Sequence, residues 1–403
     1  MRQKILRHLC MPAKGYQLMG NRAYSSGLLK WSGVTPNAIV RIRQWGYLII
    51  AVPLLLPWVS VVMGRYTGQG DLWAWLTIGF VYLLIPLVDW LIGEDRVNAN
   101  ELDEQTRMKL INAAPYFKWL PIVCLPIYLG ALAWSTHIFV TNPLHWTWLG
   151  MFGWLLSLGT IGVVLGINVA HELVHKDSRL EQWCGGIYLS LVTYAGFKVE
   201  HVRGNHVNVS TPLDASSARY NQSLYHFWPR AMYHNVRNAF VLEAKRLVSK
   251  GVSPWHWRNE LIWWYGLSVL WASACFMVWG WVGVAFFIAQ GFIAALLLET
   301  VNYLEHYGLH RRQLDNGRYE RTTHLHSWNS GYLLTNLFLF QLQRHSDHHA
   351  NPKRRYQDLV HHDDSPQLPA GYAAMVVLAF IPPLWRRVMN PRVQAYYGNS
   401  FDH

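Results

Sequence analysis

Residues 342–350 read Leu-Gln-Arg-His-Ser-Asp-His-His-Ala, and this short stretch is the most informative part of the chain. On a helix, the spacing i, i+3, i+4 places His345, His348 and His349 within an arc of roughly 100°. Imidazole is the commonest side-chain ligand for divalent transition metals. The stretch therefore predicts a helix that presents three metal ligands on one face.

Three other short motifs also contain closely spaced histidines. Residues 171–175 read His-Glu-Leu-Val-His, residues 201–206 read His-Val-Arg-Gly-Asn-His, and residues 302–309 read Asn-Tyr-Leu-Glu-His-Tyr-Gly-Leu. No single metal ion accepts that many imidazoles, so we expect a centre with two metal ions. The predicted ligands are His171, His175, His201, His206, His306, His345, His348 and His349.

Carboxylates near these motifs are candidates for a supporting role. A ligating histidine normally donates its second N–H to a carboxylate or a carbonyl group, which fixes the orientation of the ring. The candidates are Glu172, Glu200, Asp214, Glu305 and Asp347. We predict no catalytic residue beyond the metal ligands. No ligand role is predicted for the histidines of other polar stretches, among them His310, His324, His361 and His362.

The composition and its distribution indicate a membrane protein. The chain has 403 residues, of which 52% are hydrophobic and only 14% are charged. No Asp, Glu, Lys or Arg occurs between Trp119 and His171 or between Leu261 and Leu298. Each run is long enough for two helical passes of ~20 residues, with turns near 141–143 and 279–283. With earlier spans at about 45–63 and 72–92, we predict an all-α protein with six transmembrane helices. The alternative is a set of buried helices in a large soluble protein.

The charge distribution predicts the orientation of these helices. The net charge is +12, which in a soluble protein would suggest nucleic acid as a partner. Here the basic residues cluster before the first span, whereas the loops after the third and fifth spans carry no Lys or Arg. By the positive-inside rule, both termini and all four histidine motifs are cytoplasmic. We therefore predict membrane lipid, and not nucleic acid, as the surroundings. The N-terminal segment could alternatively be a transit peptide.

The same pattern predicts the organisation of the chain. We expect a basic cytoplasmic segment at 1–44, a single transmembrane catalytic domain at 45–390 and a tail at 391–403. Within the domain, residues 171–260 form a cytoplasmic insert and residues 306–390 a cytoplasmic, histidine-rich cap. The apolar segment 185–198 is too short to span, so we interpret it as interfacial or re-entrant. We expect residues 373–384 to form a helix against the membrane interface.

The all-imidazole set favours a redox metal over other kinds of site. The motif at 171–175 alone is typical of zinc proteases, with Glu172 as the general base. Zinc needs only one more protein ligand, whereas this chain offers six further histidines at metal-like spacing. Neutral histidines suit iron, copper, nickel and zinc, but zinc has no accessible redox change. A redox pair below a helical bundle indicates oxidation of a hydrophobic chain with dioxygen. The chain has no C-x-x-C pair, so it has no iron–sulfur, rubredoxin-type or structural zinc module of its own.

The motifs resemble those of the membrane-bound bacterial alkane 1-monooxygenases. The likeness covers about residues 89–397 and includes Gly317-Arg-Tyr-Glu320, His326-Ser-Trp-Asn-Ser330 and Pro382-Pro-Leu-Trp-Arg-Arg-Val-Met389. The resemblance implies a six-helix, desaturase-like fold in the bacterial inner membrane and a non-haem centre of two iron ions. It also implies terminal hydroxylation of n-alkanes with O2, using electrons from a rubredoxin and its reductase. The absence of a C-x-x-C pair fits such a separate carrier, and we expect a basic cytoplasmic surface near Lys176, Arg311 and Arg312 to receive an acidic donor.

Two positions depart from the family pattern. The family's second motif has a histidine where this chain has Asn205, and its Thr-Pro-Glu-Asp-Pro becomes Thr211-Pro-Leu-Asp-Ala215. We expect Asn205 to bind metal weakly through its amide oxygen or to hold a water at the metal. Alternatively, Asn205 loosens one iron and leaves a slow or inactive relative. Three other hypotheses remain at this point, namely a fatty-acid desaturase, an aromatic side-chain hydroxylase and an intramembrane zinc protease.

Overall fold

The computed structural model describes residues 35–398, and in this range the protein is all-helical, with isolated bridges but no strand. The first half contains α2 (Pro36–Gly46), η1 (Tyr47–Ile50), α3 (Ala51–Thr67), α4 (Gly70–Trp73), α5 (Leu76–Gly79), η2 (Phe80–Leu84), α6 (Ile85–Ile92), η3 (Ala99–Glu101), α7 (Glu104–Asn112), α8 (Ala114–Thr141), α9 (Trp148–Ile161), η4 (Gly162–Ile167) and α10 (Asn168–Val174). The second half contains α11 (Arg179–Leu191), α12 (Phe197–Glu200), η5 (His201–Asn205), α13 (His206–Asn208), α14 (Leu224–Val248), α15 (Glu260–His306), α16 (Leu333–Phe338), α17 (His345–Ala350), η6 (Tyr356–Asp358), α18 (Tyr372–Ala379) and α19 (Pro382–Tyr397).

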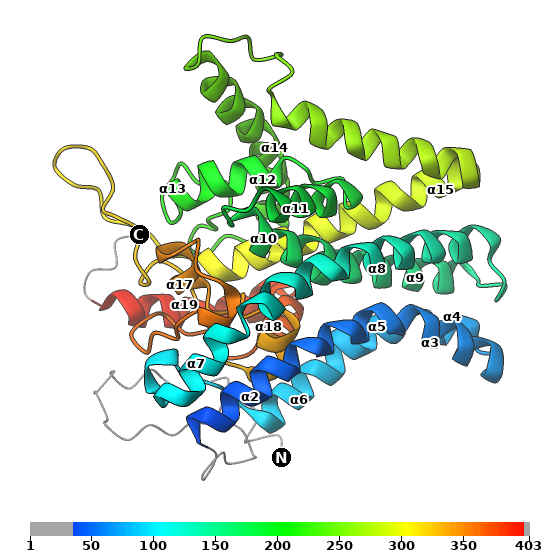
Figure 1. Cartoon of the computed structure of the whole chain (residues 1–403), viewed down its shortest axis with the longest axis horizontal. Coiled ribbons are helices and arrows are strands. Elements are labelled where there is room, and N and C mark those ends of the chain that lie inside the picture. Colours follow the sequence, from blue (N-terminus) through cyan, green and yellow to red (C-terminus); the bar gives the residue numbers. More distant parts are fainter. Residues whose placement is uncertain (1–34, 399–403) are drawn as a thin grey trace.

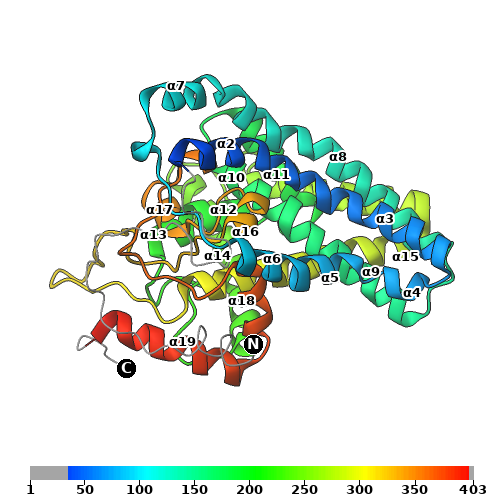
Figure 2. The same cartoon turned by 90° about the horizontal axis from the view of Figure 1, so that it is seen from below.

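Long apolar helices form one end of the molecule, and shorter helices with connecting loops form the other (Figures 1 and 2). Four helical runs in the described range are long and apolar enough to cross a membrane: Pro36–Thr67, Ala114–Thr141, Trp148–Val174 and Glu260–His306. A shorter apolar run covers Leu76–Ile92. The predicted all-helical membrane class is confirmed, whereas the number of six spans stays a prediction. Most of the basic residues used to predict the orientation precede residue 35 and lie outside the described residues.

Helix α15 doubles back on itself within its 47 residues. Gly280 has φ 64° and ψ −160°, which is not a helical conformation, and the two arms of α15 meet there (Figure 1). Only glycine adopts this backbone region readily. The reversal falls within the turn predicted at 279–283. It returns the second arm towards the short helices, so that the C-terminal residue of α15, His306, lies among them.

The segment 185–198, which we expected to be interfacial or re-entrant, packs between helices of the protein. Helix α11 packs against α10 and α15, and Tyr188, Leu189 and Leu191 are buried. Gly291 on α15 approaches the backbone of Val192 so closely that an added Cβ would lie 2.5 Å from its carbonyl oxygen. The segment is therefore enclosed by helices, and its apolar character reflects burial inside the protein.

The predicted helix over residues 373–384 is wrong in its boundaries. Helix α18 ends at Ala379, and a second helix, α19, begins at Pro382 and continues to Tyr397. Proline is well suited to the first turn of a helix because its fixed φ is helical and its missing N–H would have no partner there. The Pro382-Pro383 pair therefore begins a new helix, whereas the sequence analysis placed it at the end of the preceding one. The division into domains stays a prediction.

Candidate metal centre

Eight buried or half-buried histidines from four separate segments converge at the inner ends of the long helices. His171, His175, His201, His206 and His348 form a first group, which we call the five-histidine cluster. His306, His345 and His349 form a second group, the three-histidine cluster. Within each cluster, one possible ligand atom per residue lies within 4.8 Å of all the others. These are the eight histidines that the sequence motifs single out as ligands.

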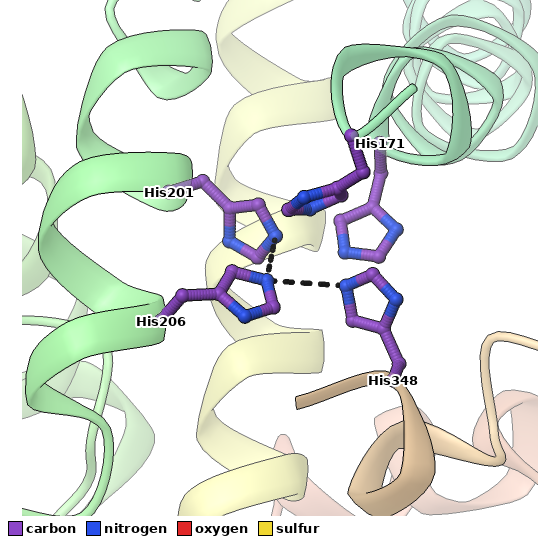
Figure 3. A group of neighbouring side chains, drawn as sticks. His171, His201, His206 and His348 are labelled. Atoms are coloured by element: carbon purple, nitrogen blue, oxygen red, sulfur yellow. Dashed lines mark hydrogen bonds between the residues drawn. The ribbon is translucent and has the colours of Figure 1, made fainter. Parts of the chain in front are cut away.

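The five-histidine cluster is built by three elements that face one another (Figure 3). His171 lies on α10, and His175 follows at the C-terminal end of that helix, one turn later. Their ring centroids are 5.3 Å apart. His348 on α17 closes the cluster from the opposite side, and its Nε2 lies 3.2 Å from Nε2 of His206.

A widened helical turn brings His201 and His206 together. In a regular α-helix, residues five apart point about 140° away from each other. The segment η5 is a π-helix, in which the backbone N–H of His206 donates to the carbonyl of His201. This wider turn places the two rings on the same face, with 3.2 Å between their Nε2 atoms. Single π-turns inside α-helices are frequently found at functional sites.

The three-histidine cluster joins the end of α15 to α17. Nε2 of His345 lies 2.9 Å from Nε2 of His349, one helical turn later. The ring of His306 lies 5.0 Å from that of His349. Glu305 also reaches this cluster, because its Oε2 is 3.1 Å from Nε2 of His345. The two clusters are adjacent, since the rings of His206 and His349 are only 4.3 Å apart.

The donor atoms fit metal ions. Nε2 of His171, His175 and His306 is buried without a hydrogen-bond partner, a costly state that a bound ion would relieve. Two nitrogens bound at right angles to one ion, each about 2.1 Å from it, lie about 3.0 Å apart. The three close Nε2 pairs, at 2.9–3.2 Å, match this spacing.

Burial also keeps the histidines outside the long helices in the neutral form that binds metal. Burial lowers the pKa of His206 to about 3. Burial, together with the neighbouring histidines, holds the pKa of His201 and of His348 well below the ordinary value. At neutral pH these rings therefore keep a free lone pair.

An apolar cavity borders the two clusters. His171, His201 and His345 contribute to its wall, so both clusters border it. The rest of the wall is mostly hydrophobic, and its residues include Val81, Ile85, Val163, Leu298, Val301, Phe338, Leu342 and Val376. Tyr82, Asn168, Asn302, Glu305, Thr335 and Tyr372 add a few polar groups. A cavity of this kind accepts a hydrophobic molecule and presents it to the histidine clusters.

Comparison with known proteins assigns the family. A family model described as fatty acid desaturase matches residues 146–379. An alkane 1-monooxygenase 2 of Pseudomonas aeruginosa is 54% identical to this chain and aligns with 90% of the chain and 95% of that protein. An alkane 1-monooxygenase 2 of Alcanivorax borkumensis is 52% identical, over 92% of the chain and 96% of that protein. The chain belongs to the alkane 1-monooxygenase family.

The assignment confirms the predicted family and the predicted enzyme class, a monooxygenase. It also decides among the alternative hypotheses. The hydroxylase component of a xylene/toluene monooxygenase from Pseudomonas putida is only 28% identical, over 58% of this chain and 62% of that protein. The two clusters are compatible with the iron chemistry of the family, and an isolated zinc-protease motif would not bring all eight histidines together.

In this member of the alkane 1-monooxygenase family, the candidate carboxylates lie in different settings. Glu305 contacts His345 and accepts a hydrogen bond of 3.0 Å from the hydroxyl of Tyr372. Glu172 pairs with Lys176 at 2.9 Å instead of contacting a motif histidine. Asp347 accepts hydrogen bonds from the side chain of Arg354 and from the backbone N–H of Val360.

Asp214 and Glu200 lie beside the five-histidine cluster. Asp214 accepts a 3.1 Å hydrogen bond from the side-chain amide of Asn205 and a 2.6 Å bond from Ser217. Burial raises the pKa of Asp214 to about 6, although these hydrogen bonds oppose the shift. Glu200 is buried, and its Oε2 has no hydrogen-bond partner. Oδ1 of Asn205 is likewise buried and without a partner, so this amide oxygen remains free to bind a metal ion or a water molecule.

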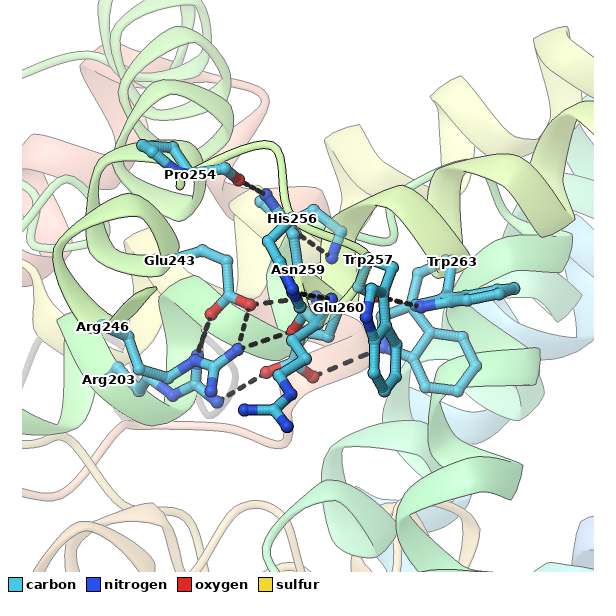
Figure 4. Close-up of polar contacts among 12 residues, drawn as sticks. Arg203, Glu243, Arg246, Pro254, His256, Trp257, Asn259, Glu260 and Trp263 are labelled. Atoms are coloured by element: carbon cyan, nitrogen blue, oxygen red, sulfur yellow. Dashed lines mark hydrogen bonds and ion pairs between the residues drawn. The ribbon is translucent and has the colours of Figure 1, made fainter. Parts of the chain in front are cut away.

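An ion-pair network outside the clusters fixes the π-helix η5. Arg203 lies between His201 and His206 in the chain and pairs with Glu243 of α14 at 2.7 Å and with Glu260 of α15 at 2.5 Å (Figure 4). Arg246 donates two further hydrogen bonds to Glu243. Nothing in the linear sequence connects these residues, because 40 and 57 positions separate Arg203 from its partners.

The basic docking surface predicted near Lys176, Arg311 and Arg312 is wrong for two of its three members. Lys176 is buried and is held by Glu172 and by the carbonyl of Arg354. Arg311 is also buried, and its guanidinium donates to the carbonyls of Val207 and Glu320. Lys176 thus neutralises a buried carboxylate, and Arg311 links two backbone carbonyl groups. Only Arg312 is exposed.

Proposed function

We propose that the protein is an integral membrane monooxygenase that inserts one oxygen atom of O2 into the terminal C–H bond of an n-alkane. The balanced reaction converts the alkane, O2, two electrons and two protons into a 1-alkanol and water. Membership of the alkane 1-monooxygenase family supports this substrate class. The observation that carries the proposal is the apolar cavity whose wall includes histidines of both clusters.

We propose that the eight histidines hold two iron ions, one in each cluster. The two ions would supply the reduction of O2 and the oxidation of the unactivated C–H bond. The five-histidine cluster offers nitrogen ligands alone, whereas the three-histidine cluster can add a carboxylate oxygen from Glu305. Asn205 is proposed to contribute its unpartnered amide oxygen, while Asp214 fixes the orientation of the amide.

The residues around the clusters bind and orient the substrate. The hydrophobic wall takes up the alkane chain and excludes water, which stabilises the bound chain by about 25 cal/mol per Å² of apolar surface buried. The rings of His201 and His345 lie 4.6 and 6.2 Å from that of His171, so the three histidines form one part of the wall, where the chain end would meet them. Glu305 reaches the same Nε2 of His345 that faces His349, so its carboxylate would act as an oxygen ligand, and the hydroxyl of Tyr372 would orient it.

The membrane arrangement is also part of the proposal. The two arms of α15, the runs containing α3, α8 and α9, and the shorter run Leu76–Ile92 supply six apolar segments. We propose that they span the bacterial inner membrane, with the histidine clusters and both termini on the cytoplasmic side. The absence of lysine and arginine from the loops after α8 and the first arm of α15 supports this orientation.

We propose a rubredoxin, reduced by its reductase, as the electron donor. We propose that it docks on the loop at 310–325 (gold in Figure 1), whose arginines are exposed, and not on the surface expected from the sequence. These arginines are Arg312, Arg318 and Arg321. Complementary charge between this loop and an acidic donor would raise the rate of encounter. Reversing the charge of Arg318 should then slow electron transfer at low salt, with little effect at high salt.

Product analysis with labelled oxygen tests the proposed reaction. The purified protein in lipid vesicles would be supplied with n-octane, ¹⁸O2, a rubredoxin and a reductase, and the products analysed by mass spectrometry. We expect 1-octanol that carries one ¹⁸O atom, and no product from the His345→Ala variant. An alkene would indicate desaturation, and either an alkene or the absence of any product would overturn the proposal.

A further inference from the structure

We propose that His324, His362 and Asp364 form a second, separate binding site for a divalent metal ion of the zinc type. The sequence analysis assigned none of these residues to a metal site. In the folded chain, one possible ligand atom of each residue lies within 4.8 Å of those of the other two. They come from two loops, so only the tertiary structure brings them together.

The three side chains lie close enough together to share one ion. The rings of His324 and His362 are nearly parallel, at 13°, with centroids 4.3 Å apart. Nε2 of His324 lies 2.9 Å from a carboxylate oxygen of Asp364. Two imidazoles and one carboxylate supply three protein ligands, and a water molecule can take the fourth position of a tetrahedral zinc site. The two nitrogen donors disfavour calcium and magnesium, which prefer oxygen ligands.

A second, independent feature is the support of His362 by Asp347. Nε2 of His362 lies 3.0 Å from Oδ1 of Asp347, which leaves Nδ1 for the ion. A carboxylate that accepts the second N–H of a ligating histidine is the usual supporting contact in zinc sites. Asp347 is itself fully buried and is fixed by Arg354 and by the backbone N–H of Val360. The orientation of His362 is therefore set by the protein interior.

The site differs from the two histidine clusters in its access to solvent. The side chains of His324 and His362 are 30% and 26% exposed, and that of Asp364 is 69% exposed. An ion at this site would exchange with the solution, whereas the eight histidines of the clusters are largely enclosed. It would also tie the loop at 310–325 to the segment that precedes α18. Because the ion binds only the folded chain, its binding should stabilise the protein against unfolding.

Zinc titration of the iron-loaded protein tests this site independently of the proposed function. Zn²⁺ alone would be added in the presence of a competing chromophoric chelator, and bound zinc and iron per chain measured by elemental analysis. We expect one bound zinc per chain in addition to the iron. His324→Gln and Asp364→Asn should each weaken zinc binding by about 10- to 100-fold without changing the iron content.

The matched control is His310→Gln, because His310 is an exposed histidine at the start of the same loop, and its ring stacks on Tyr397. This variant should bind zinc like the unmodified protein. Zinc should also raise the unfolding temperature of the unmodified protein and of His310→Gln, but not that of His324→Gln. The proposal is overturned if no additional zinc binds at 100-fold excess, if zinc binds only by displacing iron, or if all variants bind it equally.

Discussion

At the scale of single residues, the spacing of histidines in the sequence identifies the clusters, but it does not explain how every ring reaches its place. The pairs at i, i+3 and i+4 on α10 and α17 follow directly from helical geometry. The pair His201 and His206 does not, because in a regular α-helix side chains five residues apart point about 140° away from each other. The π-helix η5 resolves this difference, and the ion pairs of Arg203 that hold it come from distant parts of the chain.

Asn205 stands where the resemblance leads us to expect a histidine, so its replacement by histidine is informative. Because Oδ1 of Asn205 is buried and unpartnered, and Asn205 directly precedes the cluster residue His206, a histidine there should add a nitrogen ligand. We expect Asn205→His to slow the loss of iron to a chelator by roughly tenfold and to raise turnover. Iron retained against time, measured in a fixed concentration of chelator, checks this expectation.

Asn205→Ala serves as the control, because it removes the amide oxygen and leaves Asp214 without this hydrogen bond. It should lose iron faster than the unmodified protein. Equal rates of loss in Asn205→His and the unmodified protein would show that position 205 does not bind metal.

Glu305 is the carboxylate whose contact with a cluster histidine is clearest. Glu305→Gln keeps the size of the side chain and can still accept from Tyr372, but it removes the charge next to His345. We expect iron affinity to fall by about 10- to 100-fold, and hydroxylation activity to fall with it. The comparison is Glu104→Gln, an exposed residue of α7, which should leave both quantities unchanged. An activity of Glu305→Gln equal to that of Glu104→Gln would count against the role of Glu305 as an oxygen ligand.

At the scale of elements, the reversal inside α15 determines where one ligand lies. The absence of charged residues from 261 to 298 predicted two passes with a turn at 279–283, and Gly280 provides that turn. The boundaries near residue 380 were not predictable in the same way, because a proline pair is compatible with the end of one helix and the start of another. The sequence therefore predicted the reversal of the chain better than the exact ends of its helices.

Replacing Gly280 tests the reversal. An alanine at φ 64° and ψ −160° is strained, so Gly280→Ala should destabilise the fold by about 1–3 kcal/mol. Gly266 is the matched control, since it lies in the first arm of α15 with a regular backbone and no atom within 4 Å of an added Cβ. Gly266→Ala should be neutral or stabilising by up to about 1 kcal/mol. Unfolding by denaturant in detergent would compare the two, and equal stability would contradict the assigned turn.

At the scale of the whole molecule, the fold brings four distant motifs to one end of a bundle of apolar helices. The order of the motifs and the apolar runs predicted this convergence. The burial of Lys176 and Arg311, in contrast, could not be predicted, because a cation beside a motif looks like a surface residue until its partners are known. The proposed site of His324, His362 and Asp364 was not predicted either, because its residues lie on separate loops that only the folded chain brings together.

The proposed orientation predicts which parts of the molecule face each side of the membrane. Tyr66 lies in the last turn of α3 and is exposed, and Asp315 lies in the exposed part of the loop at 310–325. With Cys10 replaced by serine, Asp315→Cys should react with an impermeant thiol reagent only from the cytoplasmic side. Tyr66→Cys should react only from the opposite side. The control is the protein that carries only the Cys10→Ser replacement. It should not react from either side, because Cys124, Cys184 and Cys275 are buried. Reaction of both positions from one side would contradict the orientation.

The iron content of the active, purified protein tests the central claim most directly. Elemental analysis of the unmodified protein, alongside its rate of 1-alkanol formation, would count the ions that the eight histidines hold. If each cluster binds one ion, the ratio should approach two iron atoms per chain, and activity should rise in proportion to it. A single ion per chain in fully active protein, or zinc in place of iron, would contradict the account.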